Sequence, residues 1–484
     1  MKAWEMIAAA CVAFSAMAQA GGEEAAKPAR EPSVGAYRSI QEAITANPGK
    51  MVYLPAGDYE ISEKIRISAD NGGLFGPGRI IQTNPDRPVI EIERASGVRL
   101  RDLTLTRPAG KPRSNSIEQR PADSRRGESP RTEPLDRGKQ DTKAEAVIAL
   151  QCRALVLEGL RIDDNRTRSG AIVLRECAGA QVRHCLVHNY MSISVDDRTG
   201  SKDWGYAFNC IDGTGIAASD SKGVLIEGNR IVEENMLPTP EIQRKFDLGR
   251  FVKKNPEKGA LVSQKTWDAG CVGNWHQGSA ILVNGPMTSD GTQVLGNYIE
   301  NAAQGIDIHA DHVIIAQNII NNAFMGMKAM HGSRNVLIIG NQFVKNDLWS
   351  IGLMPGAASH AAAPAPAGGK PVEANVDGGS IIADNIISDF GYGNAHWVWG
   401  DDGSPIKFDT GQKPDNPPLT DVIILGNIVY DTGRDQVIVD GAPKVVPPRY
   451  RYAVSVARDA KGLHFLNNIF HPGTSGVSNV ELKP

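Results

Sequence analysis

The chain has 484 residues, of which 22% are charged, and its formal net charge at pH 7 is −3. This near-neutral balance argues against general binding of nucleic acid, which favours strongly basic proteins. Six cysteines in so long a chain exclude a dense disulfide framework.

The first twenty residues have the features of a secretory signal. Lys2 precedes the apolar run "MIAAACVAF", and Ala18-Gln19-Ala20 fits the small-x-small rule for cleavage after Ala20. We therefore expect a secreted or periplasmic protein. No other stretch is long and apolar enough to span a membrane, so no membrane contact is expected.

A polar linker, residues 21–34, separates this signal from one domain expected to cover residues 35–484. The domain begins with "YRSIQEAITANPGK", which predicts a short amphipathic helix with Ile40, Ala43 and Ile44 on one face. "MVYLPAGDYEIS" then predicts a strand.

An asparagine followed closely by apolar residues recurs along the rest of the chain. The successive gaps are 68, 21, 23, 44, 42 and 41 residues, which indicates a period of about 20 to 25 residues with insertions. Each repeat mixes short β-branched strands with Gly, Asn and Asp turns, and none shows a helical stripe. The sequence therefore predicts a parallel β-helix, whose stacked coils share one core. The asparagines are Asn229, Asn297, Asn318, Asn341, Asn385, Asn427 and Asn468.

The repeat assigns structural roles to these asparagines and to two cysteines. Inward asparagines of adjacent coils would stack at the strand spacing of about 4.8 Å and bond to one another. The alternative is a row of ligand asparagines. Leu160 and Cys185 occupy the same position upstream, and Cys152 and Cys177 each lie eight residues before it. Cys152 and Cys177 should therefore be buried neighbours on adjacent coils.

The N-terminal order of helix and strand resembles that of pectate-lyase-like β-helix proteins, in which a helix closes the open end of the core. "GLFGPGRIIQT" and "VRLRDLTLTRP" also resemble the first coils of that superfamily. The resemblance implies an all-β, right-handed parallel β-helix with an N-terminal capping helix.

Three stretches interrupt the coils. Residues 108–143 are polar and lack apolar periodicity, residues 234–276 form a long insertion, and residues 356–371 are a linker-like run of Ala, Pro and Gly. Insertions on a solenoid usually project from one face, which is often the binding face.

The strand after each asparagine alternates apolar and outward residues, and five segments align: "MSISVDD", "SAILVNG", "QGIDIHA", "MGMKAMH" and "WSIGLMP". The expected inward residues are Ile193 and Val195, Ile281 and Val283, Ile306 and Ile308, Met327 and Ala329, and Ile351 and Leu353. One outward column is Ser194, Leu282, Asp307, Lys328 and Gly352, and the next is Asp196, Asn284, His309, Met330 and Met354.

This alignment brings Asp307, His309 and Lys328 together, with Asp196 two coils below His309. An acid, a base and a cation on a rigid sheet are what an active site requires, so these four are the candidate catalytic residues. The alternative is a solvated Asp–Lys pair stacked for stability, with His309 capping a turn.

"QGIDIH" is similar to the Gly-Phe-Asp-Pro-His signature of mannuronan epimerases, with Gly305, Asp307 and His309 matching; Gln304 stands in place of that family's tyrosine. Asp196-Asp197 is similar to the paired aspartates of β-helix polygalacturonases.

The remaining candidates would bind substrate. Trp397 and Trp399 lie two apart, so they either form a platform for sugar rings or fill the core. His309 and Asp311 could share a metal, but His312 points the other way; we therefore predict no metal site, and leave calcium elsewhere open. The full set of expected substrate-binding residues is Asn284, Arg198, His276, Trp275, His331, Trp397 and Trp399.

Together these features predict a secreted, monomeric enzyme acting on a polysaccharide, most simply a lyase for uronate-containing chains. Lys328 or His309 would be the base, Asn284 and Arg198 would bind the carboxylate, and Asp307 would orient the cation. The alternatives are an inverting glycoside hydrolase using Asp196 and Asp307, a uronate epimerase, and a non-catalytic sugar-binding or adhesion solenoid.

Overall fold

The structure is a computed structural model that describes residues 31–108, 116–117, 144–167, 169–201, 205–234, 252–253, 262–263, 278–285, 288–365, 369–393, 403–431, 436–439, 441–445 and 447–484. For residues 116–117, 192–201, 205–212, 252–253, 262–263, 436–439 and 443–445 it describes the backbone. The chain divides into two compact units, residues 1–31 and 32–484, and every element below belongs to the second. The predicted signal peptide lies outside the described residues.

Most strands of this unit belong to three parallel sheets of twelve strands each. Sheet A contains β1 (Met51–Tyr53), β4 (Gly73–Phe75), β7 (Arg99–Arg101), β11 (Val156–Glu158), β14 (Gln181–Arg183), β19 (Leu225–Glu227), β24 (Gln293–Leu295), β27 (Ile314–Ala316), β30 (Leu337–Ile339), β33 (Ile381–Ala383), β36 (Thr420–Leu425) and β41 (Lys461–Leu466).

Sheet B contains β2 (Asp58–Ile61), β5 (Arg79–Gln82), β8 (Thr104–Thr106), β12 (Arg161–Asp163), β15 (Leu186–His188), β20 (Arg230–Val232), β25 (Tyr298–Glu300), β28 (Ile319–Asn321), β31 (Gln342–Val344), β34 (Ile386–Ser388), β37 (Ile428–Tyr430) and β42 (Ile469–Phe470). Sheet C contains β3 (Ile65–Ile67), β6 (Ile90–Glu93), β10 (Val147–Leu150), β13 (Ile172–Arg175), β18 (Thr214–Ser219), β23 (Ser279–Asn284), β26 (Gln304–His309), β29 (Met325–Ala329), β32 (Trp349–Leu353), β35 (Ser404–Phe408), β40 (Tyr452–Val456) and β43 (Gly476–Ser478).

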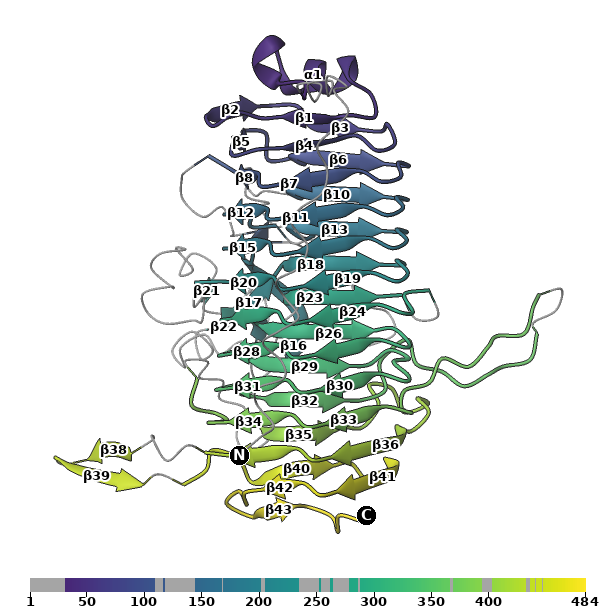
Figure 1. The fold of residues 1–484 in the computed structure, drawn as a ribbon. Coiled ribbons are helices and arrows are strands. Elements are labelled where there is room, and N and C mark those ends of the chain that lie inside the picture. The colour runs from purple at the N-terminus through teal and green to yellow at the C-terminus, as the bar shows by residue number, and fades with distance from the viewer. Residues whose placement is uncertain are drawn as a thin grey trace, which may run out of the picture. The chain divides into compact units, whose positions relative to one another are not determined.

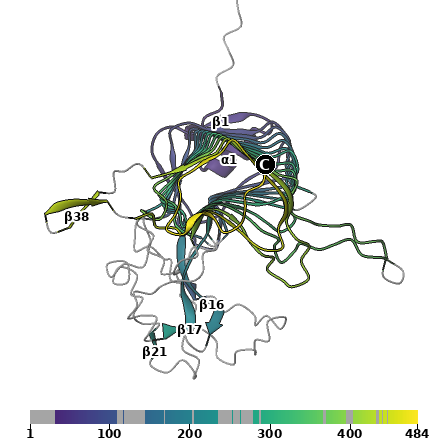
Figure 2. The same cartoon turned by 90° about the horizontal axis from the view of Figure 1, so that it is seen from below.

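Each coil contributes one strand to sheet A, then one to B, then one to C, and the next coil repeats the order (Figure 1). Seen along the stack, the coils superpose and enclose the core (Figure 2). The core follows from the alternation of side chains, because the middle residue of most three-residue strands points inward and is buried. The prediction of a right-handed parallel β-helix is confirmed.

The N-terminal end of the core is closed by a 3₁₀ turn, η1 (Val34–Ala36), and by α1 (Ile40–Ala46). The Ser39 side chain caps α1 by accepting a hydrogen bond from the Glu42 backbone N–H at 3.1 Å. Ile40 and Ala43 are buried against the first coil, and Figure 1 shows the helix across the end of the stack. The predicted capping helix is confirmed, and it covers strand edges that would otherwise be open.

The predicted asparagine ladder is also confirmed. Each side-chain amide N–H donates to the Oδ1 of the next asparagine at 2.9–3.0 Å, from Asn229 through to Asn468. The ladder begins at Cys185, whose backbone N–H donates to Asn229 Oδ1 at 2.9 Å. Asn229, Asn318 and Asn341 are at most 1% exposed, so they are structural and not a row of ligands.

Cys152 and Cys177 are buried on adjacent coils, as predicted. The Ala178 backbone N–H donates to the Cys152 carbonyl at 2.9 Å, and Arg153 pairs with Ala178 in a parallel bridge. Both thiols are unoxidised. The coil register between the 108–143 and 234–276 insertions is therefore, at these two coils, the one that the repeat indicated.

One part of the predicted register is wrong. "MSISVDD" forms β16 (Ser192–Ser201), which pairs antiparallel with β17 (Gly205–Asp212) and parallel with β9 (Ser116–Ile117), outside the three long sheets. At this level sheet C is completed by β18, between β13 and β23. Ile193 and Val195 are therefore not core positions of a coil. The sequence "TGIAAS" was overlooked because its small residues lack the branched alternation typical of strands.

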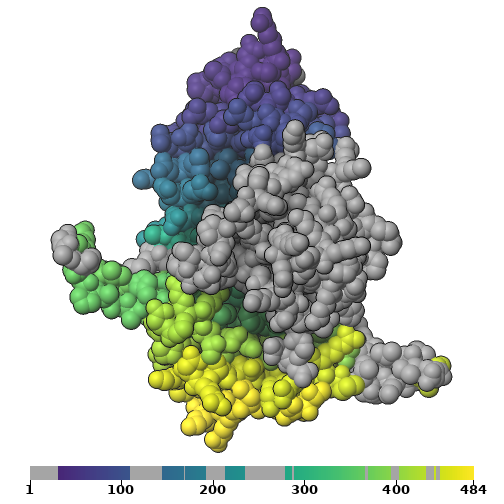
Figure 3. Space-filling view, turned by 180° about the vertical axis from the view of Figure 1, so that it is seen from behind, coloured from purple at the N-terminus to yellow at the C-terminus, as the bar shows by residue number. Residues whose placement is uncertain are grey.

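Other chain segments leave the stack between coils. Residues 355–365 and 369–377 belong to an arm, called the 355–377 arm, in which His360 pairs with Asn375 and Ala363 with Val372, both antiparallel. These residues project from the coils (Figures 1 and 3). Two small sheets pair β21 (Val252–Lys253) with β22 (Val262–Ser263), and β38 (Gln436–Val439) with β39 (Ala442–Val445). Among the described residues, no helix has the length and apolar character needed to cross a membrane.

Candidate active site

The candidate site lies on the outer face of sheet C, at β23, β26 and β29. The parallel register pairs Asp307 with Lys328 and Asn284 with His309, so these four side chains project from three consecutive coils. They face outward because Ile306, Ile308 and Met327 fill the core. The predicted adjacency of Asp307, His309 and Lys328 is confirmed.

Asp307 is at the centre of this cluster. Its Oδ1 lies 2.9 Å from His309 Nε2, and its Oδ2 lies 3.3 Å from Lys328 Nζ. The Asp307 side chain is 6% exposed, against 16% for His309 and 14% for Lys328. Burial would raise the pKa of Asp307, but the charges of His309 and Lys328 outweigh burial and hold that pKa well below its usual range.

The His309 contact is close but angled. Nε2 and Oδ1 are within hydrogen-bonding distance, yet neither atom has a partner with hydrogen-bond geometry. Such misalignment is common in catalytic groups before substrate binds. With its Nε2 side turned to a carboxylate, His309 keeps Nδ1 as its basic nitrogen.

His331, a predicted substrate-binding residue, packs against His309. The two rings meet edge to face with centroids 4.4 Å apart. Burial, and then the charges of His309 and Lys328, lower the pKa of His331 to about 3, so its ring is neutral at ordinary pH. Its Nδ1 accepts a hydrogen bond from the Ala358 backbone N–H at 3.2 Å, which leaves the proton on Nε2.

The base of the 355–377 arm holds His331 in place. Asn375 donates through Nδ2 to the His331 carbonyl at 2.8 Å, and a Cβ at Gly356 would meet the His331 ring at 2.1 Å from Nδ1. Glycine is therefore required where the arm leaves the coil. A sequence resembling a linker thus positions part of the site.

Asp377 closes the arm and was not predicted. Its Oδ1 accepts from the backbone N–H groups of Gly332 at 2.9 Å and Ser333 at 3.0 Å, and its Oδ2 accepts from the Ser359 hydroxyl. Burial raises the pKa of Asp377 to about 6, although these hydrogen bonds oppose the shift. No sequence pattern links Asp377 to His331, because the arm separates them.

Lys407 was also missed, although a signal was present. Sheet C pairs Lys328 with Gly352 and Gly352 with Lys407, so Lys407 continues the outward column that contains Lys328. The alternation in "SPIKF", with Ile406 and Phe408 buried, could have placed Lys407 there. Lys407 Nζ lies 3.8 Å from Asp409 Oδ2.

Asp196 is not where the sequence placed it. It belongs to β16 of the separate hairpin and not to sheet C, whose strand at that level is β18, with Ala217 and Ser219 in line with Leu282 and Asn284. Its neighbour Arg198 lies on the same hairpin, and only the backbone of β16 is described. Trp275, His276, Trp397 and Trp399, and most of the 234–276 insertion, lie outside the described residues.

The side chains around Asp307 can also be examined as possible metal ligands. Among the side chains that the structure describes, no three His, Cys, Asp or Glu residues gather as metal ligands would. The positive charge beside Asp307 comes instead from the chain itself, through Lys328.

No protein-family model matches this sequence, and neither does any curated protein. Solved structures similar to this chain include the A-module of an Azotobacter vinelandii mannuronan C-5 epimerase, at 14% identity over 91% of this chain and 100% of that one, with a TM-score of 0.47. Another is a hyperthermoactive exopolygalacturonase from Thermotoga maritima, at 13% identity over 89% and 86% of the two chains and a TM-score of 0.49. A third is the catalytic unit of an α-1,3-glucanase from Streptomyces thermodiastaticus, at 13% identity over 94% and 71% and a TM-score of 0.47. At such identities and TM-scores, the likeness carries nothing about activity.

Proposed function

We propose that this protein is an exported lyase that cleaves a uronate-containing polysaccharide by β-elimination. The observation that carries the proposal is the buried, ionised Asp307 held between His309 and Lys328 on rigid strands. A site built on strands keeps its groups within the narrow tolerance that proton abstraction needs. Export is proposed from the first twenty residues, and it would bring the enzyme to such a substrate.

Each residue has a role in this reaction. His309 Nδ1 takes the proton from C5 of the uronate, and Lys328 neutralises the adjacent carboxylate, which stabilises the carbanion-like intermediate. The electron pair then forms the C4–C5 double bond as the C4–O bond breaks, and the leaving oxygen takes a proton from water. Asp307 orients the His309 ring and the Lys328 ammonium. Asn284, beside His309 in the register, lies within reach of the sugar.

A hydrolase would need a protonated carboxylic acid beside the scissile bond. The depressed pKa of Asp307 keeps that group ionised, which opposes an acid role. The oxygens of Asp377, whose pKa is raised, are already occupied by Gly332, Ser333 and Ser359. Within the described side chains, the cluster therefore favours proton abstraction over hydrolysis.

The test is a panel of purified polyuronates with neutral polysaccharides alongside. The expected result is ultraviolet absorbance from unsaturated uronate ends, lost in His309→Ala and kept in His464→Ala, an exposed histidine on β41. New reducing ends without unsaturation would establish a hydrolase. Exchange of deuterium at C5 without cleavage would establish an epimerase, and binding without any reaction a sugar-binding solenoid; each of these overturns the proposal.

We also propose that the reaction needs no metal, since Lys328 supplies the cation. Activity on the identified substrate should then survive dialysis against a chelator. Loss of activity that added calcium restores would show that a metal, and not Lys328, neutralises the carboxylate.

A further inference from the structure

The outward column of sheet C that contains Asp307 and Lys328 differs on its two sides. Toward the N-terminus, from β13 through β18 to β23, its members are apolar. Toward the C-terminus it continues on β32, β35 and β40 with Gly352, Lys407 and Ser455. Within this column, an acidic chain that starts at Lys328 therefore meets a second cation in the C-terminal direction, at Lys407. The apolar members are Val173, Ala217 and Leu282.

The position between the two lysines is filled by an indole from the same strand. Ile351 and Leu353 are buried in the core, so a side chain at Gly352 would point outward. Trp349 occupies that space instead, because a Cβ added to Gly352 would meet the Trp349 ring at 2.8 Å from Cε2 and 3.0 Å from Nε1. The indole nitrogen therefore lies on the outer face of sheet C, in line with both lysines.

This indole carries a polar group that lacks a partner. Trp349 is 8% exposed and packs against Phe324 and Met325, and its Nε1 is buried without a hydrogen-bond partner in the described structure. A buried indole N–H normally finds an acceptor, and an unpaired one indicates a place where a ligand or a water supplies it. The apolar neighbours of Trp349 supply none, so we expect the acceptor to come from a bound molecule.

Lys407 also has donors to spare. Its Nζ lies 3.8 Å from Asp409 Oδ2, which is longer than a hydrogen bond, and its side chain is 18% exposed. An ammonium group can donate three hydrogen bonds, so the contact with Asp409 leaves donors for an arriving carboxylate. Lys407 and the Trp349 N–H together therefore offer a charged and a neutral donor beside Lys328.

We propose that Trp349 and Lys407 form a second sugar-binding position, which selects a uronate two sugars away from the one that reacts. This inference rests on the proposed lyase activity. Lys328 and Lys407 are two coils apart, about 10 Å by the strand spacing, which is close to the length of a disaccharide. In a ribbon-like polyuronate, alternate sugars turn the same edge to one side, so carboxylates two sugars apart can reach both ammonium groups. The Trp349 N–H donates to an oxygen of the sugar between them.

This position determines how the substrate lies and which substrate is preferred. The polysaccharide runs along the stack from β29 toward β35, with the reacting uronate at Lys328. The sugar in the middle is bound by a neutral donor, so it need not be acidic. The site therefore prefers chains that carry a uronate at every second position or more often, and it discriminates against chains in which uronates are isolated.

The first experiment measures binding without turnover, by titration calorimetry on the His309→Ala variant. The probes are tetramers of mannuronate, galacturonate and glucuronate, and the same tetramers with their carboxyl groups reduced to alcohols. At least one acidic tetramer should bind more tightly than its reduced form. At low salt, Lys407→Met should weaken that binding about 10-fold, because a hydrogen bond to a charged group is lost. Lys461→Met, an exposed lysine on β41, is the matched control and should bind the tetramer unchanged.

Trp349 needs a variant that separates its N–H from its packing. Trp349→Phe removes the donor and keeps an aromatic ring beside Phe324 and Met325. Its weaker binding of the acidic tetramer should be similar at low and high salt, whereas the effect of Lys407→Met should shrink as salt is added. Thermal unfolding of each variant shows whether the coils are intact.

Turnover separates this inference from the proposed lyase activity. On a polyuronate that yields unsaturated ends, Lys407→Met should raise KM more than it lowers kcat, because Lys407 binds away from the reacting atoms. Unsaturated products with wild-type binding and KM in Lys407→Met would overturn the second position and leave the lyase standing. Tetramer binding that depends on Lys407, without unsaturated products, would overturn the lyase and leave the position as a uronate-binding site. If no acidic tetramer binds more tightly than its reduced form, the second position is ruled out.

Discussion

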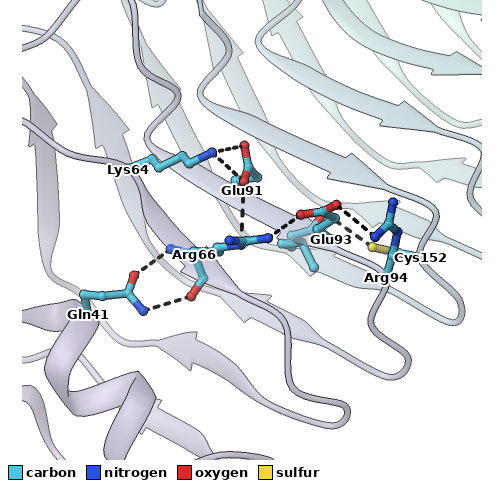
Figure 4. Close-up of polar contacts among 8 residues, drawn as sticks. Gln41, Lys64, Arg66, Glu91, Glu93, Arg94 and Cys152 are labelled. Carbon is cyan, nitrogen blue, oxygen red and sulfur yellow. Dashed lines mark hydrogen bonds and ion pairs between the residues drawn. The ribbon is translucent and has the colours of Figure 1, made fainter.

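Two charged clusters lie on the outer face of sheet C, and they differ mainly in burial. Near the N-terminal end, Lys64 bonds to Glu91 and Arg66 bonds to Glu93, each at 2.6 Å (Figure 4). In the middle of the sheet, Asp307 contacts His309 and Lys328. In the first cluster Lys64 and Arg66 are 32% and 55% exposed, and their partner Glu91 is 14% exposed. In the second, Lys328 is 14% and Asp307 is 6% exposed.

The same register produced both clusters, since Arg66 pairs with Glu91 as Asp307 pairs with Lys328. Water screens the first cluster, so its ion pairs contribute little. The second has lost its water, so each charge depends on its neighbours. Cross-strand pairing alone therefore does not distinguish a functional site from a stabilising surface pair, and burial does.

The largest expected difference is in turnover. Lys328→Met should lower the rate of β-elimination about 10²- to 10⁴-fold, because the developing carbanion loses its neutralising charge. Initial rates on the identified polyuronate measure the loss. Lys461→Met, on exposed β41, is the matched control and should keep the wild-type rate. Full activity in Lys328→Met would show that the central cluster, like the exposed one, is a stabilising ion pair without a catalytic role.

The next difference is in stability. Asp307→Asn should destabilise the fold by about 3–5 kcal/mol, because Lys328 loses its buried counter-charge. The midpoint of thermal unfolding at neutral pH reports this loss. The folded pKa of Asp307 is depressed, so its contribution is present above the unfolded pKa of about 3.9 and is lost as the pH falls below that value. A variant as stable as wild type would contradict the assigned charges.

Asp377 should show the opposite pH dependence. Its folded pKa of about 6 exceeds the usual value, so its contribution is present at low pH and is lost between about pH 4 and 6. Asp377→Asn should remove about 2–3 kcal/mol of that dependence. Thermal unfolding across this pH range compares the variant with Ser455→Asn, a polar position elsewhere on sheet C. Identical pH profiles for Asp377→Asn and wild type would rule the effect out.

The smallest effect is expected at the exposed cluster. Glu91→Gln should change stability by less than about 1 kcal/mol, because both of its cation partners can be solvated instead. Added salt should reduce even this difference. Unfolding at low and high ionic strength gives the measurement. A loss as large as that of Asp307→Asn would remove the distinction between the clusters.

The sequence was informative where the coils repeat. Asn318 and Asn341 recur 23 residues apart, each between two short strands, and the same frame placed Lys328 beside Asp307. It failed where the chain leaves the stack. "MSISVDD" alternates as a coil strand does, and only tertiary pairing shows that "TGIAAS" fills the coil instead. Asp377 reaches the neighbourhood of His331 through an arm that no period describes.

The asparagine ladder sets a unit of length for this molecule. Because each amide needs a partner one coil away, the stack itself can lengthen or shorten only by whole coils, whereas segments such as the 355–377 arm leave it between coils. Duplication of residues 319–341 would add one rung, with its own asparagine, and leave every other bond intact. A partial duplication would leave a buried asparagine amide without a hydrogen-bond partner. Each such unpaired group lowers the free energy of unfolding by about 1–3 kcal/mol. A duplication within the stack therefore preserves the ladder only when it adds a whole number of coils.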